Sequence, residues 1–358
     1  MCIAPAGFAL VLSATLSHAV GLDRSGQSVG IIFKDGNYVE LSFGYVNPTI
    51  DGKSVTSATS QISNVASNYS QLGLGLKTDV SEQLSFALIV DEPYGADIEY
   101  PSDAAAPLGN TAANLDSWAI TGMARYKIDE SFSMHGGLRT QHISGNVVLP
   151  GAGTTVELEQ SSAVGYAIGG AYERSDIALR VALTYFSEVE HEFDTTTGGA
   201  FQEVLTVKTP QAVNLDFQTG LNEDTLLFGS VRWAEYSVVD VTPTPVGSSI
   251  VNVEDGFTYS LGLGRRFSEK FSGSLSATLG TPGEDDLVSP LGPRNGSQSI
   301  GIGGQYRINE NLTLSSGARY IVFGDARPEL DTPTTDTPYA ELKDNSAIAV
   351  GFKIGYSF

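Results

Sequence analysis

Seven arginines fall on one face of segments in which large apolar side chains alternate with small or polar ones. A guanidinium binds a carboxylate through two parallel hydrogen bonds, so unpaired arginines on a shared face would attract an anionic head group. Glu40 and Asp216 fall in the same phase, and pairing with such acids would instead make the arginines structural. Both interpretations stay open. One of the seven is Arg307. The other six are the candidate substrate-binding residues: Arg125, Arg139, Arg180, Arg232, Arg266 and Arg319.

Other residue types that carry chemistry give weak signals. Beyond residue 19 the chain has three histidines, and none stands in a readable nucleophile pattern: His135, His142 and His191. The acidic run at 284–286 could hold a divalent cation that bridges lipopolysaccharide, but a solvated loop is the simpler interpretation. We therefore expect no enzyme activity, no catalytic residue, no metal site and no cofactor.

The arginines need a scaffold with two chemically different faces, and the last twelve residues, AIAVGFKIGYSF, have this form. Large apolar residues alternate there with small or polar ones, which is the period of two of a β-strand. The second face is mostly Gly, Ala and Ser in other segments too, whereas a soluble β-sandwich or propeller would carry many Lys, Glu and Thr there. We therefore expect the large apolar face to meet lipid, with a secreted soluble β-protein as the alternative.

Short charged turns connect consecutive strands in pairs. They lie at residues 77–84, 127–132, 173–179, 221–227, 266–271 and 307–312. Longer segments rich in Thr, Ser, Gly, Pro and Asp lie between them, such as 47–68, 92–114, 187–210, 281–297 and 324–345. Six short turns and seven long loops predict fourteen strands of about 9–11 residues. The pattern is typical of an all-β transmembrane antiparallel β-barrel with short periplasmic turns and long extracellular loops.

Composition sets the remaining limits. The chain has 358 residues, a net charge of −21 and a single cysteine, Cys2. The negative charge argues against nucleic acid as a partner. Residues 1–19 are apolar and end in Ser17-His18-Ala19, which is typical of a secretory signal peptide, and no later apolar run is long enough for a transmembrane helix. We divide the chain into a signal peptide (1–19), a short N-terminal periplasmic or plug segment (20–36) and a barrel (37–358).

Several segments resemble the long-chain fatty acid transporter (FadL/TodX) family of outer-membrane proteins. They are residues 214–237, residues 303–327 and the closing AVGFKIGYSF, while FALIVDEPYGADIEYP (86–101) fits the third strand of the family. The resemblance covers most of residues 37–358. It implies uptake of hydrophobic compounds, chiefly fatty acids or aromatic hydrocarbons, through a barrel in the outer membrane of a Gram-negative bacterium. Outer-membrane lipid and lipopolysaccharide would surround such a barrel, and a terminal Phe358 is typical of chains handled by the barrel assembly machinery.

The resemblance also bears on gating. Family members usually carry a longer N-terminal hatch, whereas only VGLDRSGQSVGIIFKDG precedes the first strand here, so we expect a short plug. In the family a kink in the third strand opens the barrel wall sideways. Pro93, which has no N–H for the strand ladder, and Gly95 stand at the corresponding place. We predict a break in strand pairing near Asp91–Ala96, with Pro93 and Gly95 as lateral-gate residues. A strand that simply ends there is the alternative.

A general diffusion porin for small polar or anionic solutes is the main alternative function. A purely structural or adhesive barrel is a weaker one. Bilayer conductance separates the first two, because a porin gives large stable open steps and a plugged channel for hydrophobic substrates gives little.

Overall fold

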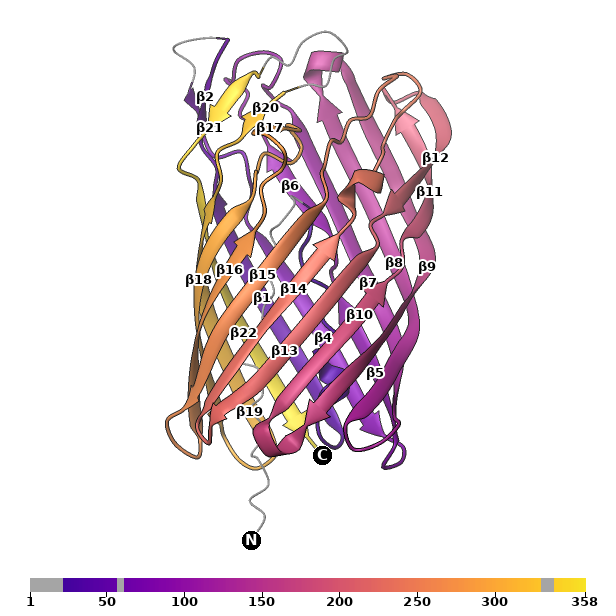
Figure 1. Ribbon diagram of the computed structural model, residues 1–358. Helices are drawn as coiled ribbons and strands as arrows, with labels where there is room; N and C mark the ends of the chain where they lie inside the picture. The colour runs from indigo at the N-terminus through magenta and orange to yellow at the C-terminus, as the bar shows by residue number, and fades with distance from the viewer. Residues whose placement is uncertain (1–21, 57–60, 330–337) are drawn as a thin grey trace.

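The computed structural model describes residues 22–56, 61–329 and 338–358. Its main element is a closed antiparallel barrel (Figure 1). The first and last barrel strands pair from Tyr38↔Ser357 to Thr49↔Ser346, which closes the sheet. The predicted fourteen strands are confirmed, and they are β1 (Tyr38–Thr49), β4 (Tyr69–Asp79), β5 (Leu84–Asp91), β7 (Ala112–Lys127), β8 (Phe132–Leu149), β9 (Thr154–Arg174), β10 (Leu179–Phe186), β13 (Ala212–Asn222), β14 (Thr225–Ala234), β15 (Gly256–Arg266), β16 (Phe271–Gly280), β18 (Ser297–Arg307), β19 (Leu312–Phe323) and β22 (Ser346–Ser357).

The two ends of the barrel differ as the sequence predicts. All six predicted short turns connect neighbouring strands, namely β4–β5, β7–β8, β9–β10 (through the 3-10 helix η3, Ser175–Ile177), β13–β14, β15–β16 and β18–β19. They lie at the lower end of the barrel in Figure 1, together with the C-terminus. The longer connections lie at the opposite end, so the turn end and the loop end are distinct.

The outer surface of the barrel is an apolar belt. Side chains of the predicted lipid-facing phase are exposed, as with Leu41 (53%) and Ile302 (64%), whereas inward residues of the same sheet such as Ala349 are buried. Aromatic side chains mark the turn end of the belt, where Phe132 packs on Tyr172 with ring centroids 5.0 Å apart. No helix in the described ranges is long and apolar enough to cross a membrane.

One predicted long loop is wrong. Residues 187–210 contain a hairpin of β11 (Val189–Thr197) and β12 (Phe201–Thr209), and β11 pairs with the end of β9 through Thr195↔Leu158. The Thr-rich composition resembled a loop, but Thr is a good strand former, and alternate residues of β11 are buried. This hairpin and the 21-residue β9 extend the wall beyond the belt at the loop end.

Short elements complete the loop end. A three-stranded sheet joins β2 (Gly52–Ser54), β3 (Gln61–Ile62) and β21 (Ala340–Leu342), and a parallel pair joins β17 (Leu287–Val288) and β20 (Arg327–Pro328). The 3-10 helices η2 (Pro150–Ala152) and η4 (Tyr236–Val238) lie in two further connections. Inside the barrel, residues 22–37 carry a single 3-10 turn, η1 (Gly30–Phe33), and run from the level of β6 (Gly95–Glu99) to the start of β1.

Candidate functional site

The barrel wall is interrupted beside its third strand. β5 ends at Asp91 and the chain resumes as β6 at Gly95, with Pro93 in the gap. β4 pairs with β5 only from Asp79↔Ser85 to Leu74↔Val90, and β6 pairs with β7 instead of β4. Above the gap, the Ser67 N–H donates to the Asp97 carbonyl at 3.0 Å. Among the described residues, 69–73 of β4 therefore face no strand on this side. The predicted break near Asp91–Ala96 is confirmed. β5 does end at Asp91, as the alternative held, but the chain returns to the sheet as β6 instead of continuing as a loop.

The N-terminal segment supplies the backbone partners that the break removes. The Arg24 N–H donates to the Pro93 carbonyl at 2.9 Å, and the Ser25 N–H donates to the Glu92 carbonyl at 3.0 Å. The Gly95 N–H donates in turn to the Leu22 carbonyl at 2.9 Å. A backbone break at membrane depth is tolerated only where protein or water satisfies its polar groups. The segment at 22–25 thus acts as a short inner strand behind the break.

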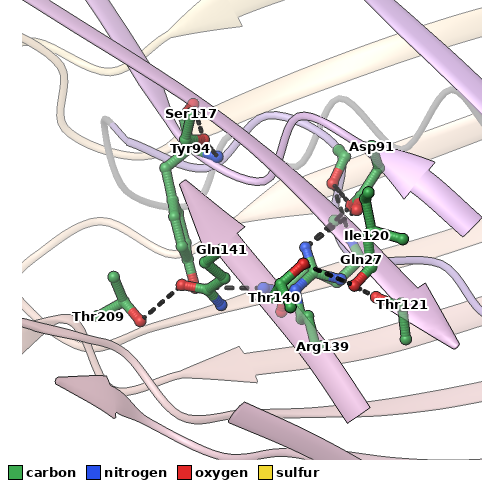
Figure 2. Close-up of polar contacts among 12 residues, drawn as sticks. Gln27, Asp91, Tyr94, Ser117, Ile120, Thr121, Arg139, Thr140, Gln141 and Thr209 are labelled. Atoms are coloured by element: carbon green, nitrogen blue, oxygen red, sulfur yellow. Dashed lines mark hydrogen bonds and ion pairs between the residues drawn. The ribbon is translucent and has the colours of Figure 1, made fainter. Parts of the chain in front are cut away.

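Side chains reinforce this contact (Figure 2). Arg139 on β8 reaches across Thr121 on β7, to which it donates at 2.9 Å, and binds both carboxylate oxygens of Asp91 at 3.0 and 3.2 Å. Ser25 donates to the same carboxylate. Figure 2 also shows Tyr94, whose hydroxyl accepts a bond from Gln27 at 3.2 Å. The end of β5 is therefore fixed by both the barrel wall and the N-terminal segment.

A cavity of about 180 Å³ lies in the wall at the break. Its outer mouth is lined by the lipid-facing residues Phe43, Leu72 and Leu74, each at least 42% exposed. Its inner lining includes the polar residues Gln71 and Glu92, and the Glu92 carboxylate accepts the Leu72 N–H at 3.1 Å. This cavity, called the wall opening below, is thus lined by residues of both the lumen face and the apolar belt.

Two anchors hold the N-terminal segment in the lumen. Asp23 is buried and accepts from Arg232 of β14 at 2.7 Å. The Phe33 ring contacts two guanidiniums, with the Cζ atoms of Arg125 and Arg180 at 4.7 and 4.8 Å from its centroid. Cation–π contacts of this length are favourable, the more so away from water. The segment is thus tied to three separate parts of the wall, including the break.

Most of the predicted arginines already have a carboxylate partner. The pairs are Arg125–Glu173, Arg139–Asp91, Arg232–Asp23 and Arg266–Asp224. Arg266 lies beside the β13–β14 turn rather than deep in the lumen. Arg180 and Arg319 have no carboxylate within ion-pair distance among the described residues, and both line a large cavity.

That cavity is a chamber of about 960 Å³ between the N-terminal segment and the turn end. Ile31 and Phe33 form part of its roof, and turn residues such as Gln83, Ser131 and Glu310 line its rim. Lys34, beside η1, faces the same space, where burial and the nearby Lys353 lower the pKa of its ammonium to about 8. Many charged side chains line the chamber, whereas Phe43, Leu72 and Leu74 line the outer mouth of the wall opening.

The histidines occupy unrelated places. His135 is inward and buried, and its Nε2 hydrogen-bonds the Thr184 hydroxyl at 2.8 Å. The sequence placed His191 in a long loop, but the residue is buried on strand β11. His142 stacks on Trp118 with ring centroids 3.8 Å apart. No group of three His, Cys, Asp or Glu side chains suited to a metal ion occurs in the ranges that the structure describes.

The sequence missed the partners at the break. Asp23, Arg24, Ser25 and Glu92 carried no periodic signal, because the first three precede the first strand and the last lies in the gap. Only Pro93 and Gly95 pointed to this region. The predicted signal peptide, 1–19, lies outside the described residues.

Comparisons with known proteins agree with this architecture. No curated protein sequence matches the chain. A FadL homologue from Pseudomonas aeruginosa has a similar structure, with a TM-score of 0.72 and 12% identity over 92% of each chain. The toluene transporter TodX of P. putida gives 0.68 with 14% identity over 91% of each chain. TbuX, a toluene transporter of Ralstonia pickettii, gives 0.62 with 12% identity over 91% of this chain and 90% of that one.

At such identities the structural likeness supports the barrel fold alone. The family is established by sequence, because residues 30–358 match the family described as outer membrane protein transport protein (OMPP1/FadL/TodX). That range includes every barrel strand and the segment that carries η1. The chain therefore belongs to the OMPP1/FadL/TodX family of outer membrane transport proteins.

Proposed function

We propose that the protein takes up hydrophobic compounds, including long-chain fatty acids and small aromatic hydrocarbons, and releases them sideways through the wall opening beside β5. The observation that carries the proposal is the break itself, whose outer mouth is apolar and faces the lipid belt. Similar solved structures are described as toluene transporters and as a FadL homologue, which agrees with substrates of this class.

Lateral release fits the energetics of an apolar substrate. Such a molecule gains nothing by entering periplasmic water, whereas transfer into lipid is favourable by about 25 cal/mol per Å² of apolar surface. The direct path to the periplasm also crosses the N-terminal segment and then a chamber lined by charges. We propose that the segment at 22–36 acts as a short plug, and that Pro93 and Gly95 shape the exit.

A general diffusion porin remains the second candidate, and the polar chamber favours it. The two functions differ in a paired measurement on one preparation. Outer-membrane vesicles carrying the protein should take up radiolabelled toluene and oleate faster than vesicles without it. The same protein in planar bilayers should give little ion conductance. Large stable conductance steps without faster toluene or oleate uptake would instead establish the porin.

Arginine variants should separate substrate contact from structural pairing. Arg180→Gln and Arg319→Gln should weaken oleate uptake by about tenfold while toluene uptake stays near wild type, because only the fatty acid offers a carboxylate to an unpaired guanidinium. Arg139→Gln leaves Asp91 without its partner at the break and should impair both substrates alike. Equal losses of both substrates in all three variants would make the arginines purely structural.

A further inference from the structure

The chamber at the periplasmic end contains three cations that form no ion pair with any described residue. Arg319 on β19 has neither a hydrogen-bond partner nor an ion-pair partner in the described part of the chain, although it lies within the wall of the chamber. Gly301 on the adjacent β18 leaves room for it, since a Cβ there would lie 3.3 Å from the Arg319 Nε. A guanidinium has five N–H donors, and those of Arg319 meet no acceptor in the described part of the chain.

Two further cations face the same space. Arg180 donates to Gln218 at 3.1 Å and rests on the Phe33 ring, but has no carboxylate partner among the described residues. Lys34 lies over the Tyr38 ring at 5.2 Å from its centroid, and Lys353 and Arg180 are near enough to lower the pKa of its ammonium. Lys353 itself is paired with Glu40 at 3.3 Å. Acidic residues line the chamber too, and Asp35 lies near both Lys34 and Arg180. Among the described residues, the three cations Arg319, Arg180 and Lys34 nevertheless form no ion pair.

We propose that the chamber is an oxyanion-binding site, in which Arg319, Arg180 and Lys34 bind a carboxylate or phosphate that enters from the periplasm. Charge-assisted bonds from a guanidinium to such a group are roughly twice as strong as neutral ones. An anion would also relieve the mutual repulsion of Lys34, Lys353 and Arg180. Eight acidic residues line the chamber as well, among them Asp216 and Asp35, and they limit the ligand to a small charge.

Access favours a ligand dissolved in the periplasm. The rim of the chamber is made of turn residues, whereas Gly26, Ile31 and Phe33 form its roof. The chamber and the wall opening nevertheless share Glu40 and Lys353, so an amphiphile could place its head in the chamber and its chain in the opening. Both ligands present the same oxyanion, and the length of the alkyl chain distinguishes them. The proposed oxyanion site in the chamber does not depend on lateral release of hydrophobic substrates through the wall opening.

The test is binding to the full-length mature protein in a neutral detergent. ³¹P NMR line broadening of inorganic phosphate and ¹³C NMR of carboxyl-labelled acetate should saturate in the wild type. Arg319→Gln and Arg180→Gln should each weaken binding by about tenfold or more. Arg266→Gln removes the same charge from a guanidinium that is already paired with Asp224, and should bind as the wild type does. Absence of saturation, or equal weakening in Arg266→Gln, would overturn the proposal.

Two further readouts sharpen the result. Acetate affinity should fall as the pH rises from about 7 to about 10, because deprotonation of Lys34 removes one of the three cations. The charged neighbours of Lys34 are Lys353, Arg180, Glu40 and Asp35. The dependence of acetate affinity on pH should be much weaker in Lys34→Gln than in the wild type. An unchanged pH dependence in this variant would show that Lys34 does not belong to the site. Labelled dodecanoate supplies the other arm. Affinity equal to that of acetate supports a free periplasmic anion, while a gain of about fourfold per methylene supports an amphiphile bound through the wall opening.

Discussion

Repairing the break in the barrel wall should lower hydrophobic uptake by at least about tenfold while the barrel still folds. The variant is Pro93→Val with Gly95→Ala. Valine restores an N–H that proline lacks and favours a strand, so β5 and β6 could run on as one strand. A Cβ at residue 95 would collide with the Arg24 side chain, which would loosen the N-terminal segment from the same place. Both changes favour pairing of β4 with the third strand across residues 69–73.

The measurement is uptake of labelled toluene and oleate by outer-membrane vesicles, with heat resistance of the barrel on gels as the test of folding. Gly122→Ala is a matched control, because its Cβ would meet nothing within 4 Å and residue 122 lies on the neighbouring β7. A folded double variant with wild-type uptake would remove lateral exit from the mechanism. A vertical path past the N-terminal segment would then be the better explanation.

The barrel could be predicted because lipid imposes its pattern on every strand. Residues such as Leu41 and Phe352 must face hydrocarbon while their neighbours face a wet lumen, so the period of two is strict. The six charged turns could be predicted equally well, because each connects two strands at the edge of that belt. Where the chain leaves the belt, this constraint ends. The hairpin of β11 and β12 accordingly looked like a loop.

The site was less predictable, because its contacts join distant parts of the chain. Arg232 was expected to face the lumen and does, but nothing in its surroundings names Asp23 as its partner. The same holds for Arg139 and Asp91, which lie on strands separated by β7. The alternation along a strand predicts which face of the sheet a side chain lies on, but it does not predict which residue that side chain contacts. Pro93 was informative for a different reason, since a proline at membrane depth requires a local departure from the ladder.

Releasing the N-terminal segment from the lumen should turn a barrel that conducts few ions into one that conducts them readily. Asp23→Asn removes the counter-ion of Arg232, whose guanidinium is buried beside Asn214 and Gln27. Breaking a buried ion pair from one side costs about 3–5 kcal/mol, because the remaining charge is uncompensated. The ladder between β1 and β22 does not depend on Asp23, so the barrel stays closed as a sheet. The weakened contacts are those of the segment itself.

Planar bilayers give the readout, in which the wild type should show little conductance and Asp23→Asn should show stable open steps. Asp23→Leu with Arg232→Met removes both charges, and should stay closed because an apolar pair of similar volume often replaces a buried ion pair without loss. Asp176→Asn breaks an exposed pair with Arg174 at the turn end and should leave conductance unchanged. If Asp23→Asn stays closed while its segment remains protected from protease, Phe33 and the backbone contacts at the break hold the segment without the Asp23–Arg232 pair. If the segment is released and the pore still does not conduct, the loop end rather than the segment closes the channel.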